Sequence, residues 1–238
     1  MSQTTAQLPR VASLVPSGTE TLCFIGGRGL LVARSHACDF PAPLGDVPVV
    51  TSQALRRGQL PPGADPRPLA TIDRAVVELW SGGRPLFALE APGLIAARPG
   101  VVLTQPLASG RWIDPVALHA AADAIAPRPQ VLELAPRGVE DMLDDVLRVG
   151  QVVGLEASAR AGVVALRERF ARAEDHANPY VDGPRVVVLE WTDPLVVAGH
   201  WTAQLVERAG GRHVLNPTAP VPGSGIAVGP QQAQRLAG

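Results

Sequence analysis

The longest regular pattern of apolar and polar positions lies between residues 137 and 176. Apolar side chains recur there every three or four residues from Val139 to Phe170, which predicts a helix packed along a surface. Carboxylates come early and arginines late, an order that suits the helix dipole. One helix of this length would span roughly 55 Å and suits a strut between two lobes. The alternative is two helices broken at Gly150 or Gly154, because an interior glycine costs about 1 kcal/mol relative to alanine.

On the N-terminal side of this segment, short apolar runs alternate with helical patterns. We predict strands over residues 11–15, 30–34, 101–104 and 131–134. We predict helices after Ser17, which forms a capping box with Glu20, over 72–80, over 90–97, and over 115–125 after the cap Asp114. Alternating strands and helices favour a parallel sheet. Residues 41–68, which are rich in proline and glycine, are expected to be irregular.

On the C-terminal side the same order recurs. Residues 185–191 form the strongest predicted strand, followed by a loop over 192–200, a helix over 202–209 and a short strand over 213–215. The last residues are rich in glycine and proline and end before a second sheet is completed, so the second lobe reads as incomplete. The predicted fold is therefore α/β. It comprises an N-terminal lobe (8–136), a connecting helix (137–176) and a truncated C-terminal lobe (177–238).

Composition narrows the function classes. The 238 residues can bury a sizeable core and suffice for two lobes. A net charge of -1, with acids and bases interspersed, indicates neither a nucleic-acid nor a membrane-surface partner. Cys23 and Cys38 form no disulfide or metal framework by spacing. The first residues lack a charged start followed by an apolar run, so the chain as written is expected to be cytoplasmic.

Candidate chemistry gathers in loops that follow strands. No glycine-rich phosphate loop opens a helix, and no GxSxG motif is present. Two sets of potential metal ligands occur, one in each lobe: His36, Cys38 and Asp39, and Glu190, Asp193 and His200. Such sets can hold a transition metal or cap a metal-centred cofactor. Alternatively, Asp39 closes a turn and His200 caps the helix after it.

Among the aromatic residues of this chain, the tryptophans are the best candidates for contacts with a planar ligand. Trp112 lies in a loop region of the first lobe, and Trp191 and Trp201 bracket a loop of the second. Each presents a flat apolar face with one donor, which suits stacking on a planar ligand. Burial under the sheet is an equal alternative for Trp191, and Trp80 fits the core.

Four segments together resemble a known family. They are RVASLVPSGTETL, HACDFP, ALEAPGLIAARPGVVLTQ and VVVLEWTDPLVVAGHWTAQLVERAGG. They resemble the substrate-binding proteins of vitamin B12 and iron-siderophore ABC transporters, nearest to the vitamin B12-binding branch. The resemblance covers nearly the whole chain and implies two Rossmann-like lobes joined by one rigid helix, with the ligand in the cleft between them. Members are usually periplasmic or surface-anchored.

The resemblance also implies roles for individual residues. The predicted ligand-binding residues are Pro16, Ser17, Thr19, His36, Cys38, Asp39, Gln105, Trp112, Trp191, Gly199, His200 and Trp201. Ala37 stands where an aromatic residue often touches the corrinoid, and Gln105 where some members have tryptophan. Glu90 matches an acidic residue that docks the transporter's arginines. The second such position falls near Gln231, where no carboxylate is present.

We therefore predict a monomeric, non-catalytic protein that binds cobalamin or a related corrinoid, with no further cofactor and an ABC permease as partner. One alternative is a ferric-siderophore or heme ligand in the same fold. Another is a cytosolic metal-dependent enzyme using His36, Cys38, Asp39 and His200. A third is a truncated chain with no working site.

Overall fold

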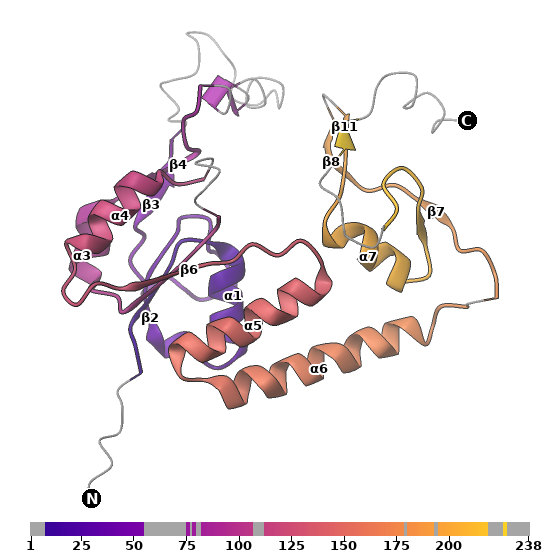
Figure 1. The fold of residues 1–238 in the computed structure, drawn as a ribbon, viewed down its shortest axis with the longest axis horizontal. Coiled ribbons are helices and arrows are strands. Elements are labelled where there is room, and N and C mark those ends of the chain that lie inside the picture. Colours follow the sequence, from indigo (N-terminus) through magenta and orange to yellow (C-terminus); the bar gives the residue numbers. More distant parts are fainter. Residues whose placement is uncertain are drawn as a thin grey trace, which may run out of the picture. The chain divides into compact units, whose positions relative to one another are not determined.

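The elements of the chain alternate between strands and helices, which confirms the predicted α/β class (Figure 1). The computed structural model describes residues 8–54, 75–76, 78–79, 82–106, 112–178, 180–192, 195–218 and 226–227. The helices are α1 (Pro16–Phe24), the short 3-10 turn η1 (Arg28–Leu30), α3 (Ala91–Ala97), α4 (Pro115–Asp123), α5 (Val139–Val153), α6 (Glu156–Glu174) and α7 (Trp201–Arg208). The strands are β1 (Val11–Ser13), β2 (Leu31–Arg34), β3 (Thr51–Gln53), β4 (Phe87–Leu89), β5 (Val101–Thr104), β6 (Gln130–Glu133), β7 (Arg185–Val186), β8 (Leu189–Thr192), β9 (Leu195–Val197), β10 (Arg212–His213) and β11 (Ile226–Ala227).

The chain divides into two compact units. The first comprises residues 1–135 and 146–160, and the second comprises residues 136–145 and 161–238. The segment between the two predicted lobes is thus shared, because α5 and α6 each supply residues to both units. None of the described helices is long and apolar enough to cross a bilayer.

A four-stranded parallel sheet forms the centre of the first unit, with the order β2-β1-β5-β6. From β1 the chain passes to β2 on one side, and it later returns to β5 on the other side. The carboxyl ends of β1 and β5 therefore mark a point where the direction of winding reverses. In open parallel sheets, such points are the usual place for a ligand.

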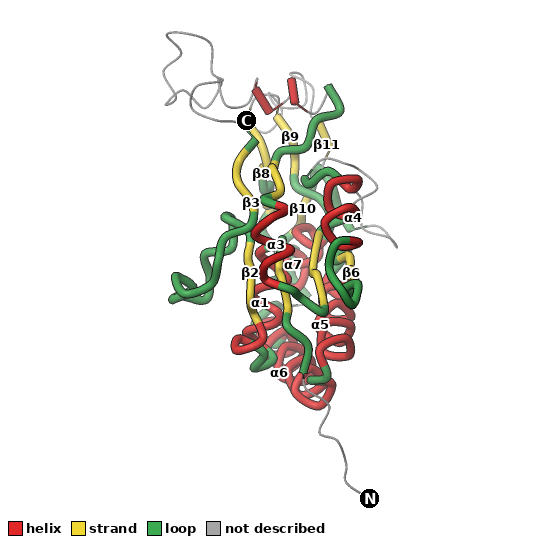
Figure 2. Tube along the Cα trace, turned by 90° about the vertical axis from the view of Figure 1, so that its left-hand side faces the viewer, coloured by secondary structure: helices red, strands yellow, loops and turns green. Residues whose placement is uncertain are grey.

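Both faces of this sheet are covered (Figure 1). Ala12 of β1 and Leu14, which follows this strand, pack into one core with Leu94 of α3 and Leu118 of α4. Figure 2 shows both helices on the near side of the strands. On the opposite face α1 approaches closely, since a side chain at Gly18 would meet Ser13 Oγ at 3.0 Å. Burial on both faces explains why the two central strands, β1 and β5, are buried at every position and mostly apolar.

The predicted single helix over 137–176 is wrong, and the alternative break at Gly154 is correct. Helix α5 ends at Val153 and α6 begins at Glu156. Gly154 has φ +74°, a conformation that favours glycine. The Leu155 N–H donates to Gly150 O at 2.7 Å, and the Gly154 N–H donates to Gln151 O at 3.4 Å. These two bonds form a Schellman motif, which satisfies carbonyls that a helix end would otherwise leave unpaired.

Other local predictions also need correction. Helix α1 starts at Pro16, with Val15 as N-cap and no side-chain cap, so Ser17 does not form a capping box. Proline is suited to the first helical position, because it lacks an N–H that would need a partner. The stretch 41–68 is not wholly irregular: it contains β3, which pairs antiparallel with β4. The part of this stretch beyond residue 54 lies outside the described residues. The same holds for much of the predicted helix over 72–80, in which residues 75–76 and 78–79 are helical.

The second unit contains two small sheets and α7. Strands β7 and β10 pair in parallel, while β8, β9 and β11 form an antiparallel sheet. The predicted strand over 185–191 is therefore two strands that belong to different sheets. The predicted loop over 192–200 contains β9, in which Val196 pairs with Trp191. Most residues of 217–238 lie outside the described part of the chain.

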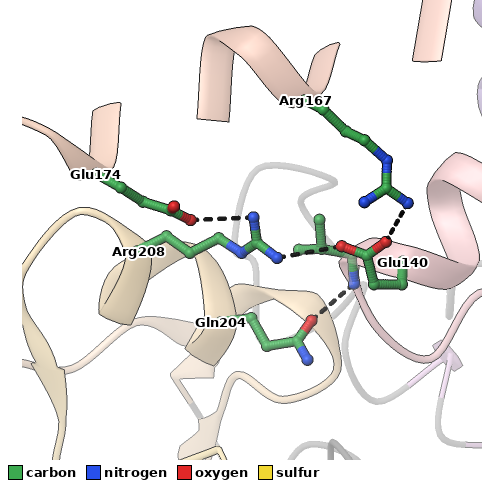
Figure 3. A network of polar contacts seen from close by, with 6 residues as sticks. Glu140, Arg167, Glu174, Gln204 and Arg208 are labelled. Carbon is green, nitrogen blue, oxygen red and sulfur yellow. Dashed lines mark hydrogen bonds and ion pairs between the residues drawn. The ribbon is translucent and has the colours of Figure 1, made fainter. Parts of the chain in front are cut away.

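A network of charged side chains holds the helices of the second unit together (Figure 3). Arg208 of α7 contacts Glu140 at 3.2 Å and Glu174 at 3.1 Å, and Arg167 contacts Glu140 at 2.6 Å. In addition, Gln204 Oε1 accepts the Val139 N–H at 2.7 Å. Because these groups are partly exposed, each ion pair stabilises the unit only modestly. Together they fix how α7 lies against its neighbours.

Candidate functional site

The carboxyl edge of the parallel sheet carries most of the predicted contacts of the first unit. Strand β1 leads into Pro16 and Ser17, β2 leads through Ser35 into His36, and β5 leads into Gln105. Ser17 and Asp39 are exposed, and Pro16 and Gln105 are half-buried. The sheet topology thus brings three separate segments to one edge, as the motifs predicted.

His36 is held at this edge by two contacts with Thr51 of β3. The His36 N–H donates to Thr51 Oγ1 at 3.0 Å, and His36 Nδ1 lies 2.7 Å from the same oxygen. Thr51 Oγ1 in turn donates to Ser35 Oγ at 2.9 Å. With the threonine proton used in that bond, Nδ1 is the donor to Thr51, and the lone pair lies on Nε2. Burial lowers the pKa of His36, which favours the neutral ring at pH 7.

Two aromatic side chains lie in a row beside the His36 imidazole: Phe87 contacts His36, and Trp112 contacts Phe87. Phe87 of β4 packs edge-on against His36, with ring centroids 4.6 Å apart and an interplanar angle of 79°. The ring centroids of Trp112 and Phe87 lie 5.8 Å apart, and the Trp112 carbonyl accepts the Phe87 N–H at 2.8 Å. All three side chains are half-buried, so each keeps an accessible surface. We call these residues, His36, Phe87 and Trp112, the aromatic edge; it offers apolar ring surface beside one imidazole nitrogen.

The loop after His36 is fixed by arginine side chains. Arg34 donates from Nη1 to Cys38 O at 2.8 Å and from Nε to Leu44 O at 3.2 Å. Arg28 donates to Pro43 O at 2.8 Å and pairs with Asp46 at 2.7 Å. These bonds satisfy carbonyls of a loop that has no regular partner strand. The position of His36 is therefore supported on both sides.

Two predicted contact residues lie inside the unit. Thr19 and Cys38 are each 0% exposed, and Cys38 Sγ is 3.8 Å from Ser13 O. Burial raises the pKa of the Cys38 thiol, although the neighbouring Thr19 hydroxyl acts in the opposite direction. Both residues are therefore packed inside the first unit, underneath the carboxyl edge of the sheet. The buried thiol is a poor candidate for a metal ligand.

In the second unit, the turn from β9 to α7 gathers the predicted residues. Glu190 Oε1 accepts the Gly199 N–H at 3.2 Å, and the rings of His200 and Trp201 lie 5.8 Å apart. His200 has φ 51° although it is not glycine, and its Nδ1 is buried with no partner among the described residues. Strained backbone and unpaired buried nitrogen atoms both cost free energy, and they concentrate at binding sites.

His200 is the N-cap residue of α7, as the alternative predicted, but its side chain makes no capping hydrogen bond. Trp191 lies on β8 and is 36% exposed, which places it at the surface of its sheet rather than underneath. Trp201 is half-buried at the start of α7. These residues keep apolar surface available within the second unit.

A buried histidine supports this turn. His213 is 1% exposed; its Nε2 accepts the Val188 N–H at 3.3 Å and its Nδ1 donates to Asn216 O at 3.1 Å. Asn216 Nδ2 then donates to Ala198 O at 3.1 Å, directly before Gly199. The chain of bonds connects β10 to the residue where the turn begins.

Replacing His213 with alanine is expected to lower the free energy of unfolding by about 2–4 kcal/mol, because it leaves a cavity and unpaired backbone groups. Urea unfolding followed by circular dichroism measures this effect. His176→Ala is the matched control, since the His176 side chain is exposed and its Nδ1 bonds to Arg172 O on the same helix end. Equal stability of the two variants would contradict the supporting role of His213.

The predicted metal ligands do not gather into a site in the part of the chain that the structure describes. No group of three His, Cys, Asp or Glu side chains placed to hold a metal occurs there. Asp193 lies outside the described residues. Glu90, the predicted transporter-docking residue, is exposed beside α3 and accepts a hydrogen bond from Ser52 Oγ at 3.2 Å.

Sequence reasoning missed Phe87 and Thr51. Both belong to the β3–β4 pair, and β3 falls in a stretch that proline and glycine made look irregular. Two signals were present: the β-branched run from Val49 to Thr51, and the apolar run over 86–89. Neither run indicates that its strand brings a side chain to His36.

Comparisons with known proteins place the fold. No family description matches the chain, and no curated protein matches its sequence. Among solved structures, a possible iron-binding periplasmic solute-binding protein from Staphylococcus epidermidis matches with TM-score 0.67 and 15% identity over 96% of this chain and 74% of that chain. A periplasmic heme-binding protein from Pseudomonas aeruginosa matches with TM-score 0.64 and 20% identity over 97% and 68%. A periplasmic vitamin B12-binding protein from Vibrio cholerae matches with TM-score 0.60 and 12% identity over 94% and 72%. These structural matches show the fold alone, and they confirm the predicted resemblance at that level.

Proposed function

We propose that this chain, which has the fold of periplasmic solute-binding proteins, is the substrate-binding component of an ABC-type uptake system and binds cobalamin or a related corrinoid. The observation that carries the proposal is the aromatic edge at the carboxyl end of the parallel sheet. A corrin ring is broad, flat and largely apolar, and ring surfaces of this kind bind such ligands through buried area. The expected cytoplasmic location has no support in the comparisons, which name periplasmic proteins.

We propose ligand contacts within each unit separately. In the first unit the contacts are the aromatic edge together with Pro16, Ser17, Asp39 and Gln105. In the second unit they are Trp191, Gly199, His200 and Trp201. Glu90 is proposed as the contact with a permease, because its carboxylate is exposed on the first unit.

Heme is the second candidate ligand, and one observation favours it. With Nδ1 bonded to Thr51, the Nε2 of a neutral His36 carries a lone pair that can coordinate iron. Cobalamin binding does not require this bond. The two ligands therefore make different demands on the same side chain.

Parallel titrations separate the candidates. Cyanocobalamin, heme and a ferric chelate are each titrated into the protein and followed by absorbance and by tryptophan fluorescence. The corrinoid proposal predicts saturable quenching by cyanocobalamin at a one-to-one ratio. A heme ligand would instead shift the heme absorption band, and His36→Asn would abolish the shift, because asparagine keeps a donor near Thr51 but lacks Nε2. Binding of the ferric chelate alone would contradict both assignments.

A further inference from the structure

A cleft lies at the amino edge of the parallel sheet, opposite the aromatic edge. It has a volume of about 520 Å³, and its walls come from the residues that precede β1, β5 and β6. That volume is within the range of small-molecule sites. It shares no residue with the aromatic edge, from which the lengths of β1 and β5 separate it. Ligands of open parallel sheets usually bind at the carboxyl edge, so a cleft at the amino edge is not part of the usual ligand site of such sheets.

Two arginines supply the polar groups of this cleft. Arg10 donates from Nε and Nη2 to Ala97 O, at 3.1 and 2.8 Å, so its guanidinium is held in place. Arg98 makes one long contact, from Nη2 to Ala126 O at 3.5 Å. Arg10 Nη1 and the Nε and Nη1 of Arg98 have no partner within the described part of the chain. Several donors therefore remain for a ligand.

Charge in the cleft is unbalanced. None of its described lining residues carries a carboxylate, so two guanidinium groups share one cavity without an internal counter-ion. Both arginine side chains are exposed, so an oxyanion can reach them, and the planar fork of arginine matches a carboxylate or phosphate. The remaining walls are apolar side chains: Leu8, Pro99, Ile125 and Pro127.

We propose that this cleft binds a small organic oxyanion, namely a carboxylate or phosphate monoester that carries an apolar group. The guanidinium of Arg98 supplies most of the hydrogen bonds, Arg10 adds a fixed positive charge, and the apolar group packs on proline and isoleucine. The site is independent of the macrocycle proposed above, because it lies at the other edge of the sheet.

The test uses phenyl phosphate as probe and inorganic phosphate as comparison, titrated into the isotope-labelled full chain at low salt. The amide resonance of Gly100, which lines the cleft, reports binding at this place. We expect saturable shifts with phenyl phosphate and weaker binding of inorganic phosphate, which lacks the apolar group. Saturation with the macrocycle is expected to leave this binding unchanged.

Variants locate the interaction. Arg98→Gln is expected to weaken phenyl phosphate binding at least about tenfold, as the loss of charge-assisted bonds implies, and Arg98→Lys to fall between it and the wild type. Arg128→Gln is the matched control, since Arg128 pairs with Asp123 at 2.8 Å and does not line the cleft. The absence of saturable shifts at Gly100 would overturn the proposal. So would equal loss in the Gln variants of Arg98 and Arg128, or equal affinity for the two phosphates. Circular dichroism confirms that each variant is folded.

Discussion

Replacing His36 with alanine is expected to weaken binding of cyanocobalamin by roughly ten- to a hundredfold. The substitution removes the ring that packs against Phe87 at 4.6 Å and the only imidazole of the aromatic edge. An aromatic contact and a hydrogen bond together contribute about 1.5–3 kcal/mol, which corresponds to that loss of affinity. Fluorescence titration with cyanocobalamin measures the dissociation constants of the wild type and the variant.

The control for this prediction is His119→Ala, because His119 is exposed on α4 and makes no part of the aromatic edge. His119→Ala is expected to bind with unchanged affinity. His36→Asn refines the test, since it keeps a donor near Thr51 while removing the rest of the ring. If His36→Ala binds cyanocobalamin as tightly as the His119 variant does, the aromatic edge is not the contact surface.

Replacing Gly150 with alanine is expected to lower the free energy of unfolding by about 2 kcal/mol. A Cβ at this position would lie 2.3 Å from the Cβ of Ala159, far inside van der Waals contact. The gain in helix propensity does not compensate, because overpacking of this kind forces the two helices apart at a cost of about 1–3 kcal/mol. Urea unfolding monitored by circular dichroism measures the change.

A second substitution shows whether the contact is responsible. Ala159→Gly removes the opposing methyl group, so the double variant Gly150→Ala/Ala159→Gly is expected to be more stable than Gly150→Ala alone. Gly29→Ala is the control, because a methyl group at Gly29 would meet nothing within 4 Å. Simple additivity of the two destabilising effects would contradict the close packing of α5 on α6.

The strands of the parallel sheet could be predicted because each is marked by a short run of consecutive apolar residues. Val101–Thr104 is buried on both faces and has no polar residue before its last position, so its pattern marks the strand directly. Asp114 likewise caps α4 by accepting the Val116 N–H at 2.9 Å, as the residue type before a proline suggested. Gly154 was recognisable only as one of two possible breaks. The turn at Gly154 brings Gly150 of α5 against Ala159 of α6. The apolar pattern of each helix by itself does not predict this contact.

The candidate site was harder to predict for a different reason. His36 lies directly after a predicted strand, and its place at the sheet edge follows from the βα order. Its partners Thr51 and Phe87 come from β3 and β4, which are separated by 33 residues and pair antiparallel outside the main sheet. Pairing between two short strands so far apart depends on tertiary packing that no local pattern records. The tautomer of His36 depends on the same pairing, through Thr51.

A crystal structure of the protein grown with cyanocobalamin tests the central claim most directly. We predict that the corrin ring contacts His36, Phe87 and Trp112 at the carboxyl edge of the parallel sheet. A corrinoid bound elsewhere on the chain, with these three side chains untouched, would contradict the account.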